Sequence, residues 1–107
     1  MGIHVLAIYR PKPDKQHELE AEVVRHVPIL RELGLATDVP SSVLRASDGA
    51  IIEHFEWVDQ AAIDAAHQHP TVHEMWERFA ACCDYGTLND LPNATTMFPE
   101  FDFVGSY

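Results

Sequence analysis

The sequence is poor in basic residues, and this shortage excludes two classes of partner. Seven lysines and arginines stand against seventeen aspartates and glutamates, which gives a formal net charge of -10 at pH 7. A field of this sign repels the phosphates of nucleic acid and the headgroups of anionic lipid. We therefore expect a partner that is neither nucleic acid nor a membrane surface.

Long apolar runs are also lacking. No stretch of the sequence approaches the ~20 apolar residues that a bilayer-spanning helix needs. The apolar run from Ile3 to Ile8 is followed directly by Tyr9 and Arg10 and does not have the layout of a signal peptide. The sequence therefore predicts a soluble, cytoplasmic protein.

Cysteine is nearly absent, since Cys82 and Cys83 are the only two. A disulfide between neighbours is strained, and the pair lacks the C-x-x-C spacing of redox and zinc sites, so we interpret both as small apolar residues. Histidines are more numerous, at seven, and His69 and His73 have the spacing of metal ligands. Pro70 interrupts that spacing and no further pair completes a set, so we predict no metal site.

The apolar periodicity of the remaining sequence predicts alternating strands and helices within one domain. Asp14 and Asp59 are expected to cap the first two helices, and Thr71 with Glu74 forms a capping box for the third. A final strand is expected at 100–104, although residues 84–88 could also be extended. The predicted elements are a strand at 3–9, a helix at 14–33, strands at 43–46 and 50–57, helices at 60–67 and 71–83, and the strand at 100–104.

The clearest local signal is a hairpin around Asp48-Gly49, a favoured two-residue turn. If these two residues form the whole loop, Val43 lies opposite His54 and Leu44 meets Glu53. Successive strand residues point to opposite faces, so Glu53 and His54 cannot both line one cavity.

The order strand, helix, strand, strand, helix, strand is the split βαβ arrangement called ferredoxin-like. It forms a four-stranded antiparallel sheet with helices on one face. The uncovered face would still carry apolar side chains, because the strands at 3–9 and 50–57 have them on both faces, and a monomer would expose too much of this surface. We therefore predict a single α+β domain over residues 1–107 that pairs sheet to sheet as a homodimer.

Three segments point to a family. Glu56-Trp57 ends a strand, Ala66-His67-Gln68-His69-Pro70 follows an alanine-rich helix, and Trp76-Glu77-Arg78-Phe79 lies downstream. This pattern resembles the antibiotic-biosynthesis-monooxygenase-like family of the dimeric α+β-barrel superfamily, and the resemblance extends from about Ile3 to Val104.

The resemblance implies a homodimer whose two sheets form a shared barrel, with an apolar cavity between sheet and helices in each subunit. Members of the superfamily oxidise electron-rich aromatic molecules with O₂ and no cofactor, degrade haem or isomerise small molecules, so fold alone does not fix function. The haem-degrading relatives use an Asn on the first strand, and residues 3–9 contain none.

The predicted catalytic residues are His67, His54 and Tyr85. His67 matches the family's histidine near the expected cavity mouth, and it could take a proton from a phenol or enol. The alternative is that His67 caps a helix or holds the turn before Pro70. His4 could neighbour His54 as an acid–base pair, or both could be hydrogen-bonded histidines at the dimer interface.

The predicted substrate-binding residues are mostly aromatic, and they form either a wall for a flat ligand or part of the core. They are Trp57, Phe55, Trp76 and Phe79, together with His4.

The sequence has no G-x-G-x-x-G, phosphate-binding loop or nucleophile elbow, so no cofactor is expected. The leading hypothesis is a cofactor-independent monooxygenase-like enzyme acting on a small apolar, aromatic or enolic molecule. The alternatives are a non-catalytic homodimer that binds a small ligand or is purely structural, and an isomerase that uses the same histidine.

Overall fold

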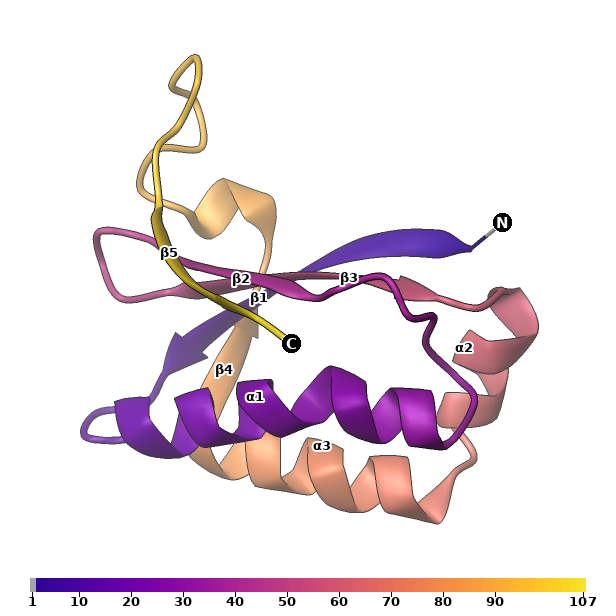
Figure 1. Ribbon diagram of the computed structural model, residues 1–107. Helices are drawn as coiled ribbons and strands as arrows, with labels where there is room; N and C mark the ends of the chain where they lie inside the picture. The colour runs from indigo at the N-terminus through magenta and orange to yellow at the C-terminus, as the bar shows by residue number, and fades with distance from the viewer. Residues whose placement is uncertain (1) are drawn as a thin grey trace.

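The computed structural model describes residues 2–107, which form one five-stranded antiparallel sheet and three α-helices (Figure 1). The elements in chain order are β1 (Ile3–Pro11), α1 (Gln16–Glu32), β2 (Ser42–Arg45), β3 (Ile51–Trp57), α2 (Gln60–Ala66), α3 (Pro70–Cys82), β4 (Cys83–Gly86), the 3-10 helix η1 (Leu88–Asp90) and β5 (Asp102–Ser106).

The strands lie in the order β4-β1-β3-β2-β5, and every neighbouring pair is antiparallel. Helices α1 and α3 lie side by side on one face of the sheet, as Figure 1 shows. The first four strands of this order, with their helices, are consistent with the predicted ferredoxin-like α+β fold.

The prediction of four strands was wrong, because the chain forms two strands after α3. Cys83–Gly86 continues directly from α3 and pairs with β1, at the edge where the fold needs its fourth strand. The segment predicted as the last strand begins two residues later than expected, at Asp102, and adds a fifth strand beside β2 at the opposite edge. The alternative that residues 84–88 are extended is confirmed in part, because β4 covers Cys83–Gly86.

The predicted register of the hairpin was wrong by one residue. Val43 lies opposite Glu53 and Leu44 opposite Ile52, so the loop has three residues instead of two. Gly49 takes a left-handed conformation with φ 91°, which fits a three-residue loop that ends in glycine. The shift turns the buried Val43 toward the helices, on the same face as Glu53.

The predicted apolar stripe of α1 is confirmed, because all four of its residues are buried against the sheet: Leu19, Val23, Val27 and Leu30. The predicted cap of this helix, Asp14, was wrong. The helix begins at Gln16 after Lys15, whose side chain makes no capping hydrogen bond, while Asp14 has a left-handed φ of 62°.

The ends of α2 and α3 also differ in how well they were predicted. Asp59 caps α2, as expected, by accepting a 2.8 Å hydrogen bond from the backbone N–H of Ala62. Helix α3 begins one residue before the expected capping box. Pro70 fits the first helical position, where no N–H is needed, and the ring of His69 accepts from the N–H of Thr71.

The sheet face opposite the helices, which we call the open face, carries no helix of α1–α3. Residues 88–101 rise over one end of it, on the side away from α1 and α3 (Figure 1). The open face carries partly exposed apolar side chains, including Leu6 and Phe103.

Within residues 2–107, every helix is too short or too polar to cross a membrane.

Candidate functional site

A carboxyl group lies in the centre of the core. Strand β3 turns Ile51, Glu53, Phe55 and Trp57 toward the helices, and the side chain of Glu53 is 0% exposed. Its Oε1 atom has two partners, the hydroxyl of Tyr9 at 2.7 Å and Nδ1 of His26 at 2.8 Å. Strands β1 and β3 and helix α1 thus each place one polar side chain at the same buried point.

The chemistry of the three side chains fixes the direction of these hydrogen bonds. Burial, followed by the charge and the hydrogen bond of Glu53, raises the pKa of Tyr9 well above its usual value, so its hydroxyl stays protonated and donates. A carboxylate only accepts hydrogen bonds, so His26 donates from Nδ1 to the same Oε1 atom. The rings of Phe55 and Phe79 pack edge-on against His26 and hold its ring in place.

The second oxygen of Glu53 has no partner. Oε2 is buried, and it makes no hydrogen bond with any of the residues 2–107. An unpaired buried polar atom costs about 1–3 kcal/mol, and more when the group is charged. Such an atom in a native core needs an explanation, and a bound molecule that donates to Oε2 would supply one.

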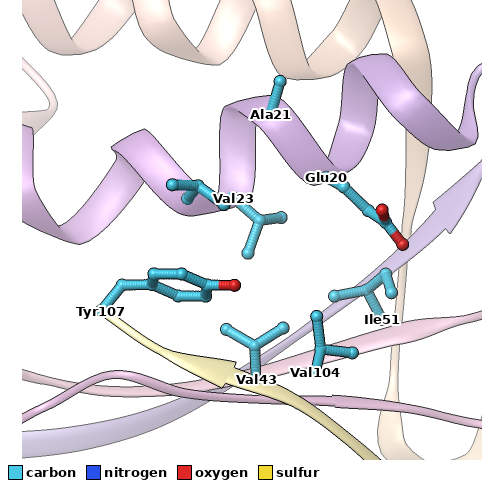
Figure 2. Close-up of a pocket in the computed structure, with 8 residues that line it drawn as sticks. Glu20, Ala21, Val23, Val43, Ile51, Val104 and Tyr107 are labelled. Atoms are coloured by element: carbon cyan, nitrogen blue, oxygen red, sulfur yellow. The ribbon is translucent and has the colours of Figure 1, made fainter.

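An apolar cavity lies near this carboxyl group, although Glu53 itself is not among the residues that line it. Val43, directly opposite Glu53, and Ile51, two residues before it on the same face, both line the cavity. Figure 2 shows Val23 of α1 facing Val43 and Val104 across the cavity, with the ring of Tyr107 at one side. We call this space the α1 cavity; its lining includes Glu20, Val23, Val43, Ile51, Val104 and Tyr107.

The α1 cavity has room for one small ring. Its volume is about 160 Å³, close to the roughly 150 Å³ of an engineered apolar cavity that binds benzene. A second hollow of about 180 Å³ shares Glu20 and Ile51 with it and opens toward Gly49. Glu20, which lines both spaces, forms an ion pair with Arg45.

The predicted site residues lie in three separate places. Phe55, Trp57 and Phe79 are buried in the core between sheet and helices. His67, Trp76 and Tyr85 lie on the outer surface of α2, α3 and β4, where Trp76 and Tyr85 line a shallow hollow with His73. His4 and His54 lie on the open face of the sheet. The chain therefore does not gather them around one cavity.

His67 stands at the end of α2, exposed to solvent. Its Nδ1 donates to the backbone carbonyl of Ile63 at 2.8 Å, and its ring meets the ring of Trp76 edge-on. These contacts agree with the alternative that His67 caps the end of the helix. A catalytic role for His67 stays a prediction. Tyr85 is 59% exposed, and partial burial, with the two cysteines nearby, raises its pKa to about 12.

The predicted proximity of His4 to His54 is confirmed. The β1–β3 register places His54 opposite Leu6, and the ring nitrogens of the two histidines are 2.9 Å apart. Whether the pair acts in catalysis or in a dimer interface stays a prediction.

The structure also places the two cysteines and the side chains considered as metal ligands. Cys82 and Cys83 are free and buried, and burial raises the pKa of Cys83 to about 12, so its thiol is unreactive at neutral pH. Across residues 2–107, no three His, Cys, Asp or Glu side chains converge as metal ligands.

Sequence reasoning missed the trio of Tyr9, His26 and Glu53. Two signals were present. His26 falls on the apolar stripe of α1 between Val23 and Leu30, and Glu53 stands among apolar residues at an inward position of β3. A polar residue on an apolar stripe needs a buried partner, and here the two polar residues are partners of each other.

No protein-family model, curated protein or solved structure matches this chain.

Proposed function

We propose that this chain is a cofactor-independent monooxygenase-like enzyme whose substrate is a small phenol or enol bound in the α1 cavity. The observation that carries the proposal is the buried, unpartnered Oε2 of Glu53, together with an apolar cavity of one-ring size that is lined by Val43 and Ile51, the neighbours of Glu53 on the same face of the sheet. A hydroxyl of the bound molecule would donate to Oε2 and complete its hydrogen bonding. The cavity accounts for the apolar body of the ligand, and Glu53 for its single acidic group.

Glu53 is the general base of this proposal. Tyr9 and His26 hold Oε1 and so fix the orientation of the carboxylate, which leaves Oε2 to accept the proton. The apolar walls of the cavity exclude water from the bound ligand. His26 and Tyr9 are positioning residues.

The reaction needs no external reductant. Once deprotonated, an electron-rich phenolate passes an electron to O₂, and the two radicals combine at a ring carbon. Loss of water then gives a quinone, so that phenol plus O₂ yields quinone plus H₂O. The substrate supplies all four electrons, one oxygen atom enters the ring and the other leaves as water.

The test is oxygen uptake by the purified protein with single-ring phenols, catechols and hydroquinones, whose size fits the α1 cavity. Glu53→Gln keeps the shape of the side chain and removes the base, so it should lower kcat about a hundredfold or more. Glu18→Gln changes an exposed carboxylate on α1 and is the control. His67→Ala belongs in the same series, because a loss of turnover there would place the base at α2 instead of in the core.

The second candidate is a non-catalytic dimer that binds a small ligand in the same cavity. Saturable binding of a phenol, with no oxygen uptake by the wild-type protein, would favour this candidate and end the enzyme proposal. Product formed without oxygen uptake would favour an isomerase.

We also propose that two copies pair through the open face. Phe103 is 66% exposed and Leu6 is 51% exposed, although both are large apolar residues on a sheet. Burying such side chains contributes about 25 cal/mol per Å² and favours association with a second apolar face. Sedimentation velocity should give a dimer for the wild type and a monomer for Phe103→Glu. Val39→Glu, at another partly exposed apolar position, should remain dimeric.

A further inference from the structure

Tyr107 forms one side of the α1 cavity, and the proposed function gives this residue no role. It follows directly after β5, the edge strand beside β2, and the chain runs from there toward α1 in Figure 1. Figure 2 shows the ring of Tyr107 at one side of the cavity, with its hydroxyl directed into the space. The ring therefore sets where the cavity ends on that side.

The backbone of Tyr107 is held in place by three hydrogen bonds. Its N–H donates to the backbone oxygen of Ser41, and the N–H of Ser41 donates back to the backbone oxygen of Tyr107, each at 2.8 Å. The guanidinium of Arg31, on α1, donates to the same oxygen of Tyr107 at 2.8 Å. Because these contacts join Tyr107 to both the sheet side and α1, its side chain starts from a fixed point at the edge of the cavity.

Gly105 provides the space in which the ring of Tyr107 lies. A Cβ atom on Gly105 would stand 2.5 Å from the hydroxyl oxygen of Tyr107 and 2.8 Å from its Cζ atom, so the ring rests directly on the backbone of β5. Gly105 does not have a left-handed backbone, so close approach of the ring is what requires a glycine here. Its partner across the β2–β5 ladder is Val43, which also lines the cavity.

The opposite side of the α1 cavity has a different character. Figure 2 shows the carboxylate of Glu20 on the side away from Tyr107, and this carboxylate forms an ion pair with Arg45. An apolar ring placed against Glu20 would remove the carboxylate from water, which costs free energy. An apolar ligand is therefore opposed by a charge at one side of the cavity and by an aromatic ring at the other.

The walls between these two sides yield little. Val23, Val43 and Ile51 line the cavity and are buried. Their β-branched side chains have restricted χ1 rotamers, so they cannot easily turn aside for a larger ligand. The volume of about 160 Å³ holds one aromatic ring, and a fused second ring would have to occupy the place of Tyr107.

We propose that Tyr107 determines the size of ligand that the α1 cavity accepts, because its ring admits a single aromatic ring and excludes a fused second one. This specificity rests on the α1 cavity being the ligand site of the proposed function. Size selection is a property of binding, so it does not require the oxygen chemistry. The cavity lies between the sheet and α1, on the face that the proposed dimer contact does not use.

The probes are phenol and 2-naphthol, which carry the same hydroxyl and differ by one fused ring. Titrations are followed by ¹³C-methyl spectra, because the methyl groups of Val23, Val43 and Val104 report on the α1 cavity. The methyl groups of Leu6 and Leu44 report on a separate hollow beneath residues 88–101. Dissociation constants taken from the valine signals therefore describe the α1 cavity and no other place on the protein.

Tyr107→Ala removes the ring and keeps the backbone hydrogen bonds to Ser41, so the variant should fold. The wild type should bind phenol and bind 2-naphthol poorly. Tyr107→Ala should bind 2-naphthol about tenfold more tightly than the wild type, or better, because the second ring buries its apolar surface where the tyrosine ring lay. Tyr107→Phe keeps the ring without the hydroxyl and is the matched control, which should exclude 2-naphthol as the wild type does.

Gly105→Ala tests the resting place of the ring. The added methyl group collides with the ring of Tyr107 and should lift it from β5 into the cavity, so phenol binding should weaken about tenfold. In a Tyr107→Ala background there is no ring to lift, and the same substitution should change phenol binding little. An equal loss in both backgrounds would contradict the contact between Gly105 and Tyr107.

Equal affinity of the wild type and Tyr107→Ala for 2-naphthol, including no binding by either protein, would overturn the proposal. Tight 2-naphthol binding by Tyr107→Phe would overturn it as well. Oxygen uptake by the same proteins separates this inference from the proposed function. A size limit that depends on Tyr107, without oxygen uptake, ends the enzyme proposal and keeps the role of Tyr107, whereas oxygen uptake with an unchanged size preference does the reverse.

Discussion

Tyr9 reaches diagonally across the sheet to Glu53, whose direct partner on β1 is Ala7. The hydroxyl of Tyr9 donates to Oε1 of Glu53 at 2.7 Å. The ring of Tyr9 also stacks on Phe79, with centroids 5.0 Å apart. Tyr9 is therefore fixed by packing as well as by its hydroxyl, which allows the two contributions to be separated.

Tyr9→Phe keeps the stacked ring and removes only the hydroxyl. Oε1 of Glu53 then loses one of its two donors while it remains buried, so the free energy of unfolding should fall by about 1–3 kcal/mol. Urea denaturation monitored by circular dichroism measures the change. Tyr85→Phe removes a hydroxyl from an exposed ring and should stay within about 0.5 kcal/mol of the wild type. Equal effects of the two substitutions would mean that the buried hydrogen bond contributes nothing.

His26 and Glu53 should be strongly coupled in stability. His26→Leu in the wild-type background leaves a buried carboxylate with only Tyr9 as donor, so the cost should be about 2 kcal/mol or more. In a Glu53→Leu background there is no carboxylate to leave unpaired, and the same substitution should cost far less. A double-mutant cycle should therefore give an interaction energy of about 1–3 kcal/mol. An additive result would contradict the orientation of Nδ1 toward Oε1.

The hairpin loop depends on the backbone freedom of one glycine. Gly49 has φ 91°, and a side chain placed there has free space, so only backbone strain opposes a substitution. Gly49→Ala should lower the free energy of unfolding by about 1 kcal/mol, and Gly49→Asn should lower it less, because asparagine tolerates positive φ better. Equal stability of Gly49→Ala and the wild type would contradict a cost of positive φ at this position.

The hairpin also illustrates where sequence reasoning succeeds and where it stops. Asp48-Gly49 located the turn, and the flanking apolar residues located both strands. Loop length, however, depends on whether Ser47 joins the loop, and turn propensity distinguishes poorly between two and three residues. The difference is one position, yet it decides that Val43 shares a face with Glu53 and lines the α1 cavity.

The candidate site was harder to predict than the fold. Periodicity identifies which residues face inward, but it does not say which inward residues of β1, β3 and α1 meet. Tyr9, His26 and Glu53 are 17 to 44 residues apart in sequence, and their contact depends on the packing angle of α1 on the sheet. The His4–His54 pair was easier, because strand register alone places two residues of neighbouring strands side by side.

Alkaline pH should destabilise the protein through Cys83. Burial raises the pKa of this thiol from 9.0 to about 12, so the folded state binds its proton more tightly than the unfolded chain. A raised pKa contributes stability that is complete below the unfolded value and is lost as pH rises from about 9 toward 12. The free energy of unfolding should therefore fall over this range.

Cys83→Ala removes the titrating thiol and keeps a small apolar side chain at the start of β4. At pH 8 the variant should have a lower free energy of unfolding than the wild type, because its side chain buries less surface. This difference in free energy, the gap, should narrow as the pH approaches 11. Tyr9, whose pKa burial also raises, will still destabilise both proteins at high pH, so the informative quantity is the difference between them. Urea denaturation at pH 8, 9.5 and 11 measures it. A gap that stays constant across this range would mean that the thiol of Cys83 titrates alike in the folded and unfolded chains, and that water reaches it at the junction of α3 and β4.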